Sequence, residues 1–232
     1  MAMNRPVDQQ AAHRMVDGQP VSVAEAQLLR VADQGSARHP HLHALVDSSG
    51  AHTGRDLADA MHLLCSLHGR YPGLIEVALQ RCADHGARAW LNQATEAFER
   101  ERLYLVRLTS AVGPVPSTPG AAETEAGLLS ARHALETLAA SERKGCALGA
   151  ATALVGDWRP IRRLLDRAAA RVGLDSPPLC LPDESSVTAV IGQVSQDPPS
   201  ERALRFGSEQ LLLQHRALFD LLEARAEARG DY

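Results

Sequence analysis

Aromatic residues are scarce in this sequence, and their scarcity argues against a fold built on β-sheets. Phe, Trp and Tyr together make up 3% of the chain, and clusters of strand-forming residues are correspondingly rare. Hydrophobic residues make up 45% and are mostly Ala and Leu, so helix propensity dominates throughout. The composition therefore predicts an all-α protein.

Closely spaced pairs of cysteines are absent, and lysine is scarce as well. No Cys-x-x-Cys spacing joins the four cysteines, which are Cys65, Cys82, Cys146 and Cys180. This pattern is typical neither of a zinc knuckle nor of a disulfide framework, and a reducing cytoplasm is the expected setting. Lys144 is the single lysine and the net charge is −4. Because no overall positive field attracts a phosphate backbone, the charge argues against nucleic-acid binding.

Long apolar runs are absent too. The longest run of small or apolar residues, GCALGAATALVG at 145–156, is shorter than the roughly 20 residues that span a bilayer. The first ten residues, MAMNRPVDQQ, lack the apolar stretch of a signal peptide. We therefore expect a cytoplasmic protein without a membrane segment.

Apolar residues recur at helical spacing between connectors rich in proline. The pattern predicts short helices at 22–34, 54–69, 72–85 and 184–195, and long helices at 87–112, 122–155, 158–173 and 200–228. Neither helix nor strand tolerates the connectors GPVPSTPG, DSPPLCLPDES and QDPPS. The segment GSARHPHLHALVDSSGAH at 35–52 is expected to be irregular.

These elements predict a four-helix bundle with a helical annex before it. We expect a flexible N-terminus at 1–21, the annex at 22–86, and the bundle at 87–232 with the short helix in its last crossover. Such a bundle is compatible with a ferritin-like arrangement. A chain of 232 residues is long enough for one such domain with a sizeable core.

One carboxylate falls where a core leucine belongs. In FERERLYLVRL at 98–108, Glu101 lies near the middle of the apolar face of its helix, between Phe98 and Leu105. An ionised carboxylate in a core is costly unless it is paired or bound to a metal. Glu101 therefore needs a partner on a neighbouring helix.

Two other helices are expected to supply polar partners for this carboxylate. Arg132, Glu136 and Arg143 share the apolar face of the 122–155 helix, and Gln214 occupies a heptad core position of the 200–228 helix. The helix at 158–173 is expected to stay apart, with a clean apolar stripe opposite a solvated face of arginines.

Three interpretations of this cluster remain open. Glu101, Arg132, Glu136, Arg143 and Gln214 could form a buried network that fixes helix register. They could instead form the floor of a small-molecule pocket, in which Arg132 or Arg143 holds a carboxylate or phosphate.

The third interpretation is a metal site for iron or manganese. Its ligands are Glu101, His133, Glu136 and His215, as in a degenerate ferritin-like site. The chain contains no Glu-x-x-His motif, which such sites use on two helices; it has only the reverse order, from His133 to Glu136. The first two interpretations need no cofactor.

Several segments carry a resemblance to a known family. The stretches LCSLHGRYPG, ERERLYLVRL, VGPVPSTPG, SERKGCALGAA and LLQHRALFDLLEAR resemble an uncharacterised all-helical family of sphingomonad-type alphaproteobacteria, over most of residues 54–230. The resemblance implies a bacterial cytoplasmic protein and no particular chemistry.

The sequence thus favours a non-catalytic binding or accessory protein with a buried Glu/Arg/Gln cluster. Its expected partner is a small anionic ligand or another protein, and a homodimer is compatible with the sequence. The alternative is a ferritin-like, metal-dependent oxidoreductase. Whether the protein is an enzyme is left undecided at this stage.

Overall fold

The computed structural model describes residues 15–16 and 19–230, so most of the expected flexible N-terminus at 1–21 lies outside the described residues. The described chain is helical apart from two short strands, β1 (Met15–Val16) and β2 (Gln19–Pro20), which pair antiparallel. The helices are α1 (Val23–Gln34), α2 (Pro40–Asp47), α3 (Thr53–His68), α4 (Leu74–Arg81), α5 (His85–Ala111), α6 (Ala121–Ala139), α7 (Cys146–Val172), α8 (Glu184–Val194) and α9 (Pro198–Arg229), with a 3-10 turn η1 (Ser36–Arg38). The prediction of an all-α protein is confirmed.

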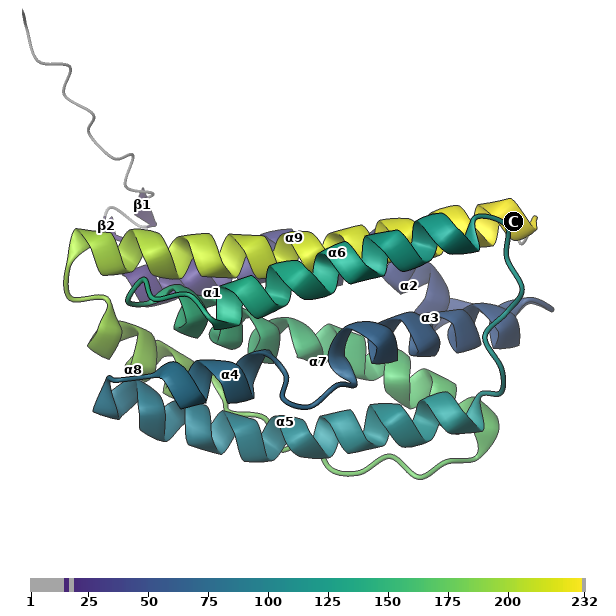
Figure 1. Ribbon diagram of the computed structural model, residues 1–232, viewed down its shortest axis with the longest axis horizontal. Coiled ribbons are helices and arrows are strands. Elements are labelled where there is room, and N and C mark those ends of the chain that lie inside the picture. Colours follow the sequence, from purple (N-terminus) through teal and green to yellow (C-terminus); the bar gives the residue numbers. More distant parts are fainter. Residues whose placement is uncertain (1–14, 17–18, 231–232) are drawn as a thin grey trace, which may run out of the picture.

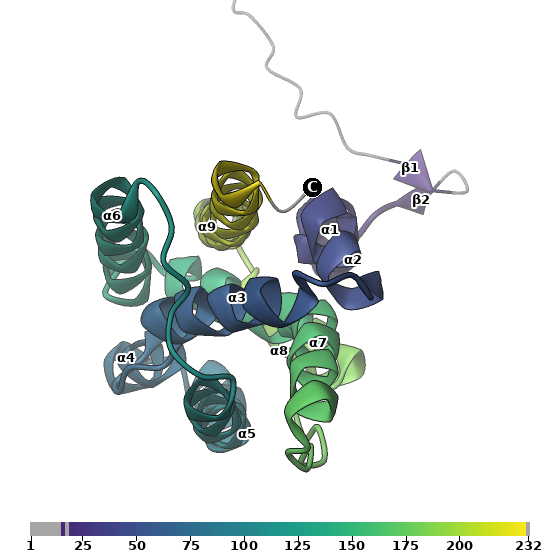
Figure 2. The ribbon, with the colours of Figure 1, turned by 90° about the vertical axis from the view of Figure 1, so that its right-hand side faces the viewer.

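The longest helices run roughly along the long axis of the molecule. Figure 1 shows α6 and α9 side by side on one side and α5 on the other. Seen along the long axis, α6, α9, α1 and α2 lie on the upper side and α4, α5 and α7 on the lower side, with α3 crossing between them (Figure 2). The helices of the predicted annex therefore pack onto the longer helices.

The prediction was wrong about the chain between 122 and 173. Instead of helices at 122–155 and 158–173, α6 ends at Ala139 and α7 runs without a break through Pro160. The chain leaves α6 after Ala139 and enters α7 at Cys146. Between them, the N-cap residue Gly145 has a φ of 96°, a left-handed conformation that favours glycine and separates the two helices. Helix α7 tolerates Pro160 because Trp158, Ile161 and Leu164 are fully buried around it.

Helix α2 lies in the segment expected to be irregular. Pro40 is its first residue, where a missing N–H does no harm. The His39 side chain caps the helix by accepting a hydrogen bond from the backbone N–H of His41, at 3.2 Å. Leu42 and Leu45 lie on the buried face of this helix. The neighbouring histidines interrupt the apolar spacing, so the sequence did not indicate a helix here.

Helices α7 and α9 approach each other so closely that their backbones touch. A Cβ atom on Gly149 would lie 2.0 Å from the carbonyl oxygen of Leu204, and one on Gly207 would lie 2.0 Å from that of Cys146. Glycine at both positions removes this clash. The close approach fixes the register of α9 on α7.

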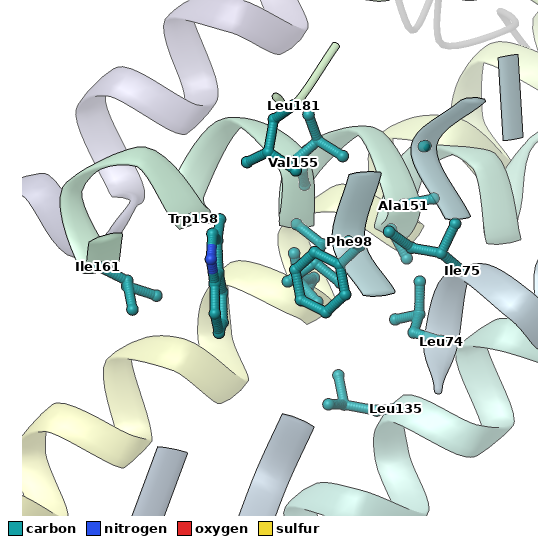
Figure 3. Close-up of a cluster of buried hydrophobic side chains, with 14 of the residues drawn as sticks. Leu74, Ile75, Phe98, Leu135, Ala151, Val155, Trp158, Ile161 and Leu181 are labelled. Carbon is teal, nitrogen blue, oxygen red and sulfur yellow. The ribbon is translucent and has the colours of Figure 1, made fainter. Parts of the chain in front are cut away.

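One hydrophobic core joins all parts of the described chain. It contains Leu57 and Met61 of α3 together with residues of α4 to α9. Figure 3 shows part of it, where Trp158 lies between Ile161 and Phe98, and Leu74 and Ile75 lie on the other side of Phe98. Within the described residues, no helix is both long enough and apolar enough to cross a membrane.

Candidate functional site

Glu101 is buried, as the sequence predicts, but its partners differ from the expected ones. One carboxylate oxygen accepts a hydrogen bond from Arg162 Nη1 at 2.8 Å, and the other accepts from Trp158 Nε1 at 3.0 Å. Both partners lie on α7, in the segment whose arginines were expected to be solvated. That expectation was wrong for Arg162, which is buried.

Arg162 connects Glu101 to the loop that follows α7. Its Nε donates to Asp166 at 2.8 Å, and its Nη2 donates to the backbone oxygen of Pro177. The guanidinium carbon lies 4.7 Å from the ring centre of Tyr104, whose hydroxyl donates to Asp166 at 3.0 Å. Each of the three guanidinium nitrogens of Arg162 therefore has an acceptor within the protein, which favours a structural role for this pair.

Burial and the local charges shift the pKa values of both members of the pair. Burial raises the pKa of Glu101, while the hydrogen bond from Trp158 and the charge of Arg162 lower it by less. Burial also lowers the pKa of Arg162, but the contacts with Asp166 and Glu101 outweigh it, so that this pKa is raised.

The other predicted site residues do not gather around Glu101. Arg132 and Gln214 are half-buried, Glu136, His133 and Arg143 are exposed, and His215 is buried. His215 donates from Nδ1 to Asp157 Oδ2 at 2.7 Å. Among the described residues, the ligand atoms of Glu101, His133, Glu136 and His215 do not converge on a common point.

A different group has the spacing of a metal site. Ligand atoms of His39, Asp220 and Glu223 lie within 4.8 Å of one another. His39 Nδ1 already accepts the N–H of His41, so a neutral ring carries its proton on Nε2, which lies 2.9 Å from Asp220 Oδ1. That nitrogen has no lone pair to offer a metal, so the group suits a hydrogen bond better than coordination.

A pocket lies at one end of the molecule, where α4 ends and α7 begins, and we call it the end pocket. It has a volume of about 660 Å³, within the range of small-molecule sites. Its apolar floor consists of Ala78, Ala87, Leu91, Ala147, Leu148 and Val194. Its charged lining consists of Arg81, Asp84, Glu142, Arg143 and Lys144.

The first turn of α7 also lines the end pocket. Gly145 is the N-cap residue, and within the described chain no side chain caps this helix end. The first N–H groups of a helix have no partners inside the helix, and they carry partial positive charge. Arg143 and Lys144 directly precede this turn, so cationic side chains and helix donors line the same pocket.

A shallower cleft beside α9 shares Arg143 and Lys144 with the end pocket. Its volume is about 550 Å³, and its further cations are Arg202 and Arg205. The Arg143 guanidinium lies 6.0 Å from the centre of the Phe206 ring. Five cationic and three acidic side chains line the two hollows together, although the whole chain carries a net charge of −4.

The sequence analysis missed a buried chain of hydrogen bonds. Asp157 accepts from the backbone N–H and the hydroxyl of Ser36, both at 2.7 Å, and from His215. His215 Nε2 lies 2.9 Å from Nε2 of His68. The expected helix break at 156–157 placed Asp157 in a connector, so no pattern pointed to its burial on α7.

Comparison with known proteins places the chain in a family without assigning it an activity. The model described as "Family of unknown function (DUF6975)" matches residues 31–230. The chain belongs to this family. No curated protein matches the chain closely enough to supply an activity. The part matched to DUF6975 contains the Glu101 pair, the end pocket, and the chain from Ser36 to His68.

Proposed function

We propose that the protein is a non-catalytic binding protein whose ligand is a small amphipathic anion held in the end pocket. The observation that carries the proposal is the placement of Arg81, Arg143 and Lys144 beside the apolar floor. Ligand sites in proteins typically combine an apolar wall with a few convergent polar groups.

The class of ligand follows from the two parts of this lining. The apolar floor favours a short hydrocarbon or ring, and the guanidinium of Arg143 matches the geometry of a carboxylate or phosphate. The uncapped first turn of α7 adds N–H donors with the same preference for anions. Asp84 and Glu142 in the same lining favour an anion of low charge.

Calorimetric titration with three probes tests the proposal. Octyl phosphate has both parts of the expected ligand, inorganic phosphate lacks the apolar part, and 1-octanol lacks the charge. We expect octyl phosphate, kept below its micelle-forming concentration, to bind at one site at least tenfold more tightly than either of the other probes. Equal binding of octyl phosphate and octanol would show that the cations do not contribute.

Variants locate the binding in the end pocket. The double variant Arg143→Gln/Lys144→Gln should weaken octyl phosphate at least fivefold, and Ala147→Phe should block it by filling the floor. Arg163→Gln is the matched control, because Arg163 is an exposed cation of α7 outside the lining of both hollows. If the control weakens binding as much as the double variant does, the proposed site is wrong.

The same proposal includes a cytoplasmic bacterial setting, supported by four cysteines that are all free. The alternative, a ferritin-like oxidoreductase with iron or manganese, has less support from the geometry. Glu101 already bonds Trp158 and Arg162, and His215 already bonds Asp157. A metal would have to displace these partners.

A further inference from the structure

A chain of four polar residues runs through the core from η1 to α3, and we call it the relay. It consists of Ser36, Asp157, His215 and His68. Each of the four is less than a tenth exposed. The relay is separate from the end pocket and plays no part in the function proposed above.

The hydrogen bonds of the relay assign the protons on its two imidazoles. The Asp157 carboxylate only accepts, so His215 carries its proton on Nδ1 and has a lone pair on Nε2. His68 must then donate from its own Nε2 across the 2.9 Å contact. The lone pair of His68 is therefore on Nδ1, which has no hydrogen-bond partner among the described residues.

His68 lines a small cavity of about 50 Å³. Since a cavity needs about 10 to 15 Å³ of such volume to hold one water molecule, this cavity has room for a ligand the size of formate or acetate. Its apolar wall includes Phe98 and Leu135, and its polar lining is Arg70, Arg132 and Glu136. Two arginines against one glutamate favour a small anion.

An anion that bonds the His68 ring must approach Nδ1, because Nε2 is taken by His215. While the ring is neutral, the lone pair on Nδ1 repels the anion. Protonation converts the contact into a charge-assisted hydrogen bond. Without an anion, the ring stays neutral at neutral pH, because burial, His215 and Arg102 hold the pKa of His68 well below its usual range. The negative charge of an entering ligand would offset each of these three effects.

The charged and titratable groups around His68 come from every helix packed against it. They are His215 of α9, Asp157 of α7, Arg102 of α5 with its partner Glu76 of α4, and Arg70, Arg132 and Glu136 at the cavity. Arg102 is already paired with Glu76. The relay through His215 to Asp157 is therefore the route by which a positive charge on His68 is stabilised.

We propose that this cavity binds a small carboxylate together with one proton, which the relay accepts. The proton comes from solvent and forms an N–H bond at His68 Nδ1. The proton on His68 Nε2 can then shift to Nε2 of His215, which leaves the positive charge beside Asp157. Only N–H bonds form and break, so the ligand is released unchanged.

Calorimetric titration with acetate tests this inference, with acetamide as the neutral control of equal size. Titration at pH 7.5 in two buffers of different ionisation enthalpy measures proton uptake. We expect acetate to take up about one proton and acetamide to bind at least tenfold more weakly. Failure of acetate to bind at up to 50 mM, or binding without proton uptake, would overturn the proposal.

Two variants separate the roles of the residues. Arg132→Gln should weaken acetate at least fivefold and leave the proton uptake near one, whereas His68→Gln should abolish the uptake. If His68→Gln still takes up a proton when acetate binds, another group accepts that proton, and the assignment of the uptake to His68 is overturned. Because a relay variant could impair folding, nitrogen-15 spectra of the wild-type histidines provide a second test. His68 should be protonated only on Nε2 without acetate. When acetate binds, the relay should gain one proton from solvent.

Discussion

Glu101 of α5 and Arg162 of α7 form a buried ion pair, with 2.8 Å between the carboxylate oxygen and Nη1. Trp158, one helical turn before Arg162, binds the other oxygen of the same carboxylate. This arrangement requires α7 to continue through Pro160, because only an unbroken helix places residues four apart on one face. The pair therefore depends on the same helix that carries Asp157 of the relay.

Replacing Glu101 with leucine should destabilise the protein. The change leaves Arg162 buried without its main partner, and breaking such a pair costs roughly 3 to 5 kcal/mol. We expect a loss near the lower end of this range, because Asp166 still accepts from Arg162 Nε. Urea denaturation followed by circular dichroism measures the free energy of unfolding.

The double variant Glu101→Leu/Arg162→Met provides the control for that prediction. Removing both charges should recover part of the loss, since replacing a buried pair by apolar groups is often close to neutral. If the double variant loses as much free energy of unfolding as the two single variants lose together, the pair contributes no coupling energy.

The stability of the protein should fall in mild acid partly because of His68. Its folded pKa lies well below the ordinary value of 6.5, so below pH 6.5 the unfolded chain binds a proton that the folded protein does not. Stability from this residue is present above that pH and is lost as the pH falls towards the folded pKa. The slope is about 1.4 kcal/mol per pH unit for one proton.

Comparison with His68→Gln isolates this contribution, because the other histidines and the carboxylates titrate in both proteins. Urea denaturation at several pH values between about 5 and 7.5 should give a shallower pH dependence for the variant. Parallel curves, offset by a constant free energy, would mean that His68 becomes protonated in the folded state as readily as in the unfolded chain.

Alanine at Gly149 should be strongly destabilising. Its Cβ would lie 2.0 Å from the carbonyl oxygen of Leu204, and backbone cannot move aside as a flexible side chain can. Overpacking of this kind costs about 1 to 3 kcal/mol, and more where the neighbour is rigid. The melting temperature should therefore fall by several degrees.

Gly127→Ala is the matched control for that substitution. Gly127 is an exposed residue within α6, and a Cβ there would meet nothing within 4 Å. Alanine should stabilise the helix by roughly 0.5 to 1 kcal/mol. If both alanine variants shift the melting temperature in the same direction, the close approach of α7 and α9 does not explain why position 149 is a glycine.

Asp59 should hold the C-terminal end of α9 against α3. Its fully buried carboxylate accepts from Arg225 Nε at 2.9 Å and from Arg229 Nη1 at 2.6 Å. Asp59→Asn should cost roughly 3 kcal/mol or more and speed amide hydrogen exchange in the last turns of α9. Asp220→Asn, which changes a largely exposed carboxylate, should cost less than about 1 kcal/mol.

Residue order alone was enough to predict the all-α class and most helix boundaries. The same reasoning identified Glu101 as a buried carboxylate. The fold class, the helix boundaries and the position of Glu101 all follow from local propensity and from periodicity within one helix. The prediction for α9, 200–228, differs from Pro198–Arg229 by two residues or fewer at either end. The connector at 113–120 lies outside the helices, as predicted, because proline restricts the backbone there. The prediction was wrong for QDPPS, because Pro198 and Pro199 form the first turn of α9, where proline is tolerated.

Which polar residues meet depends on how the helices pack. Packing of Trp158 and Ile161 outweighed the helix-breaking tendency of Pro160, so α7 continues through this position. That continuation moved Arg162 and Asp157 from expected solvent and connector positions into the core. Contacts between residues far apart in the chain, such as His68 and His215, leave no periodic trace in one sequence, because each depends on how whole helices pack.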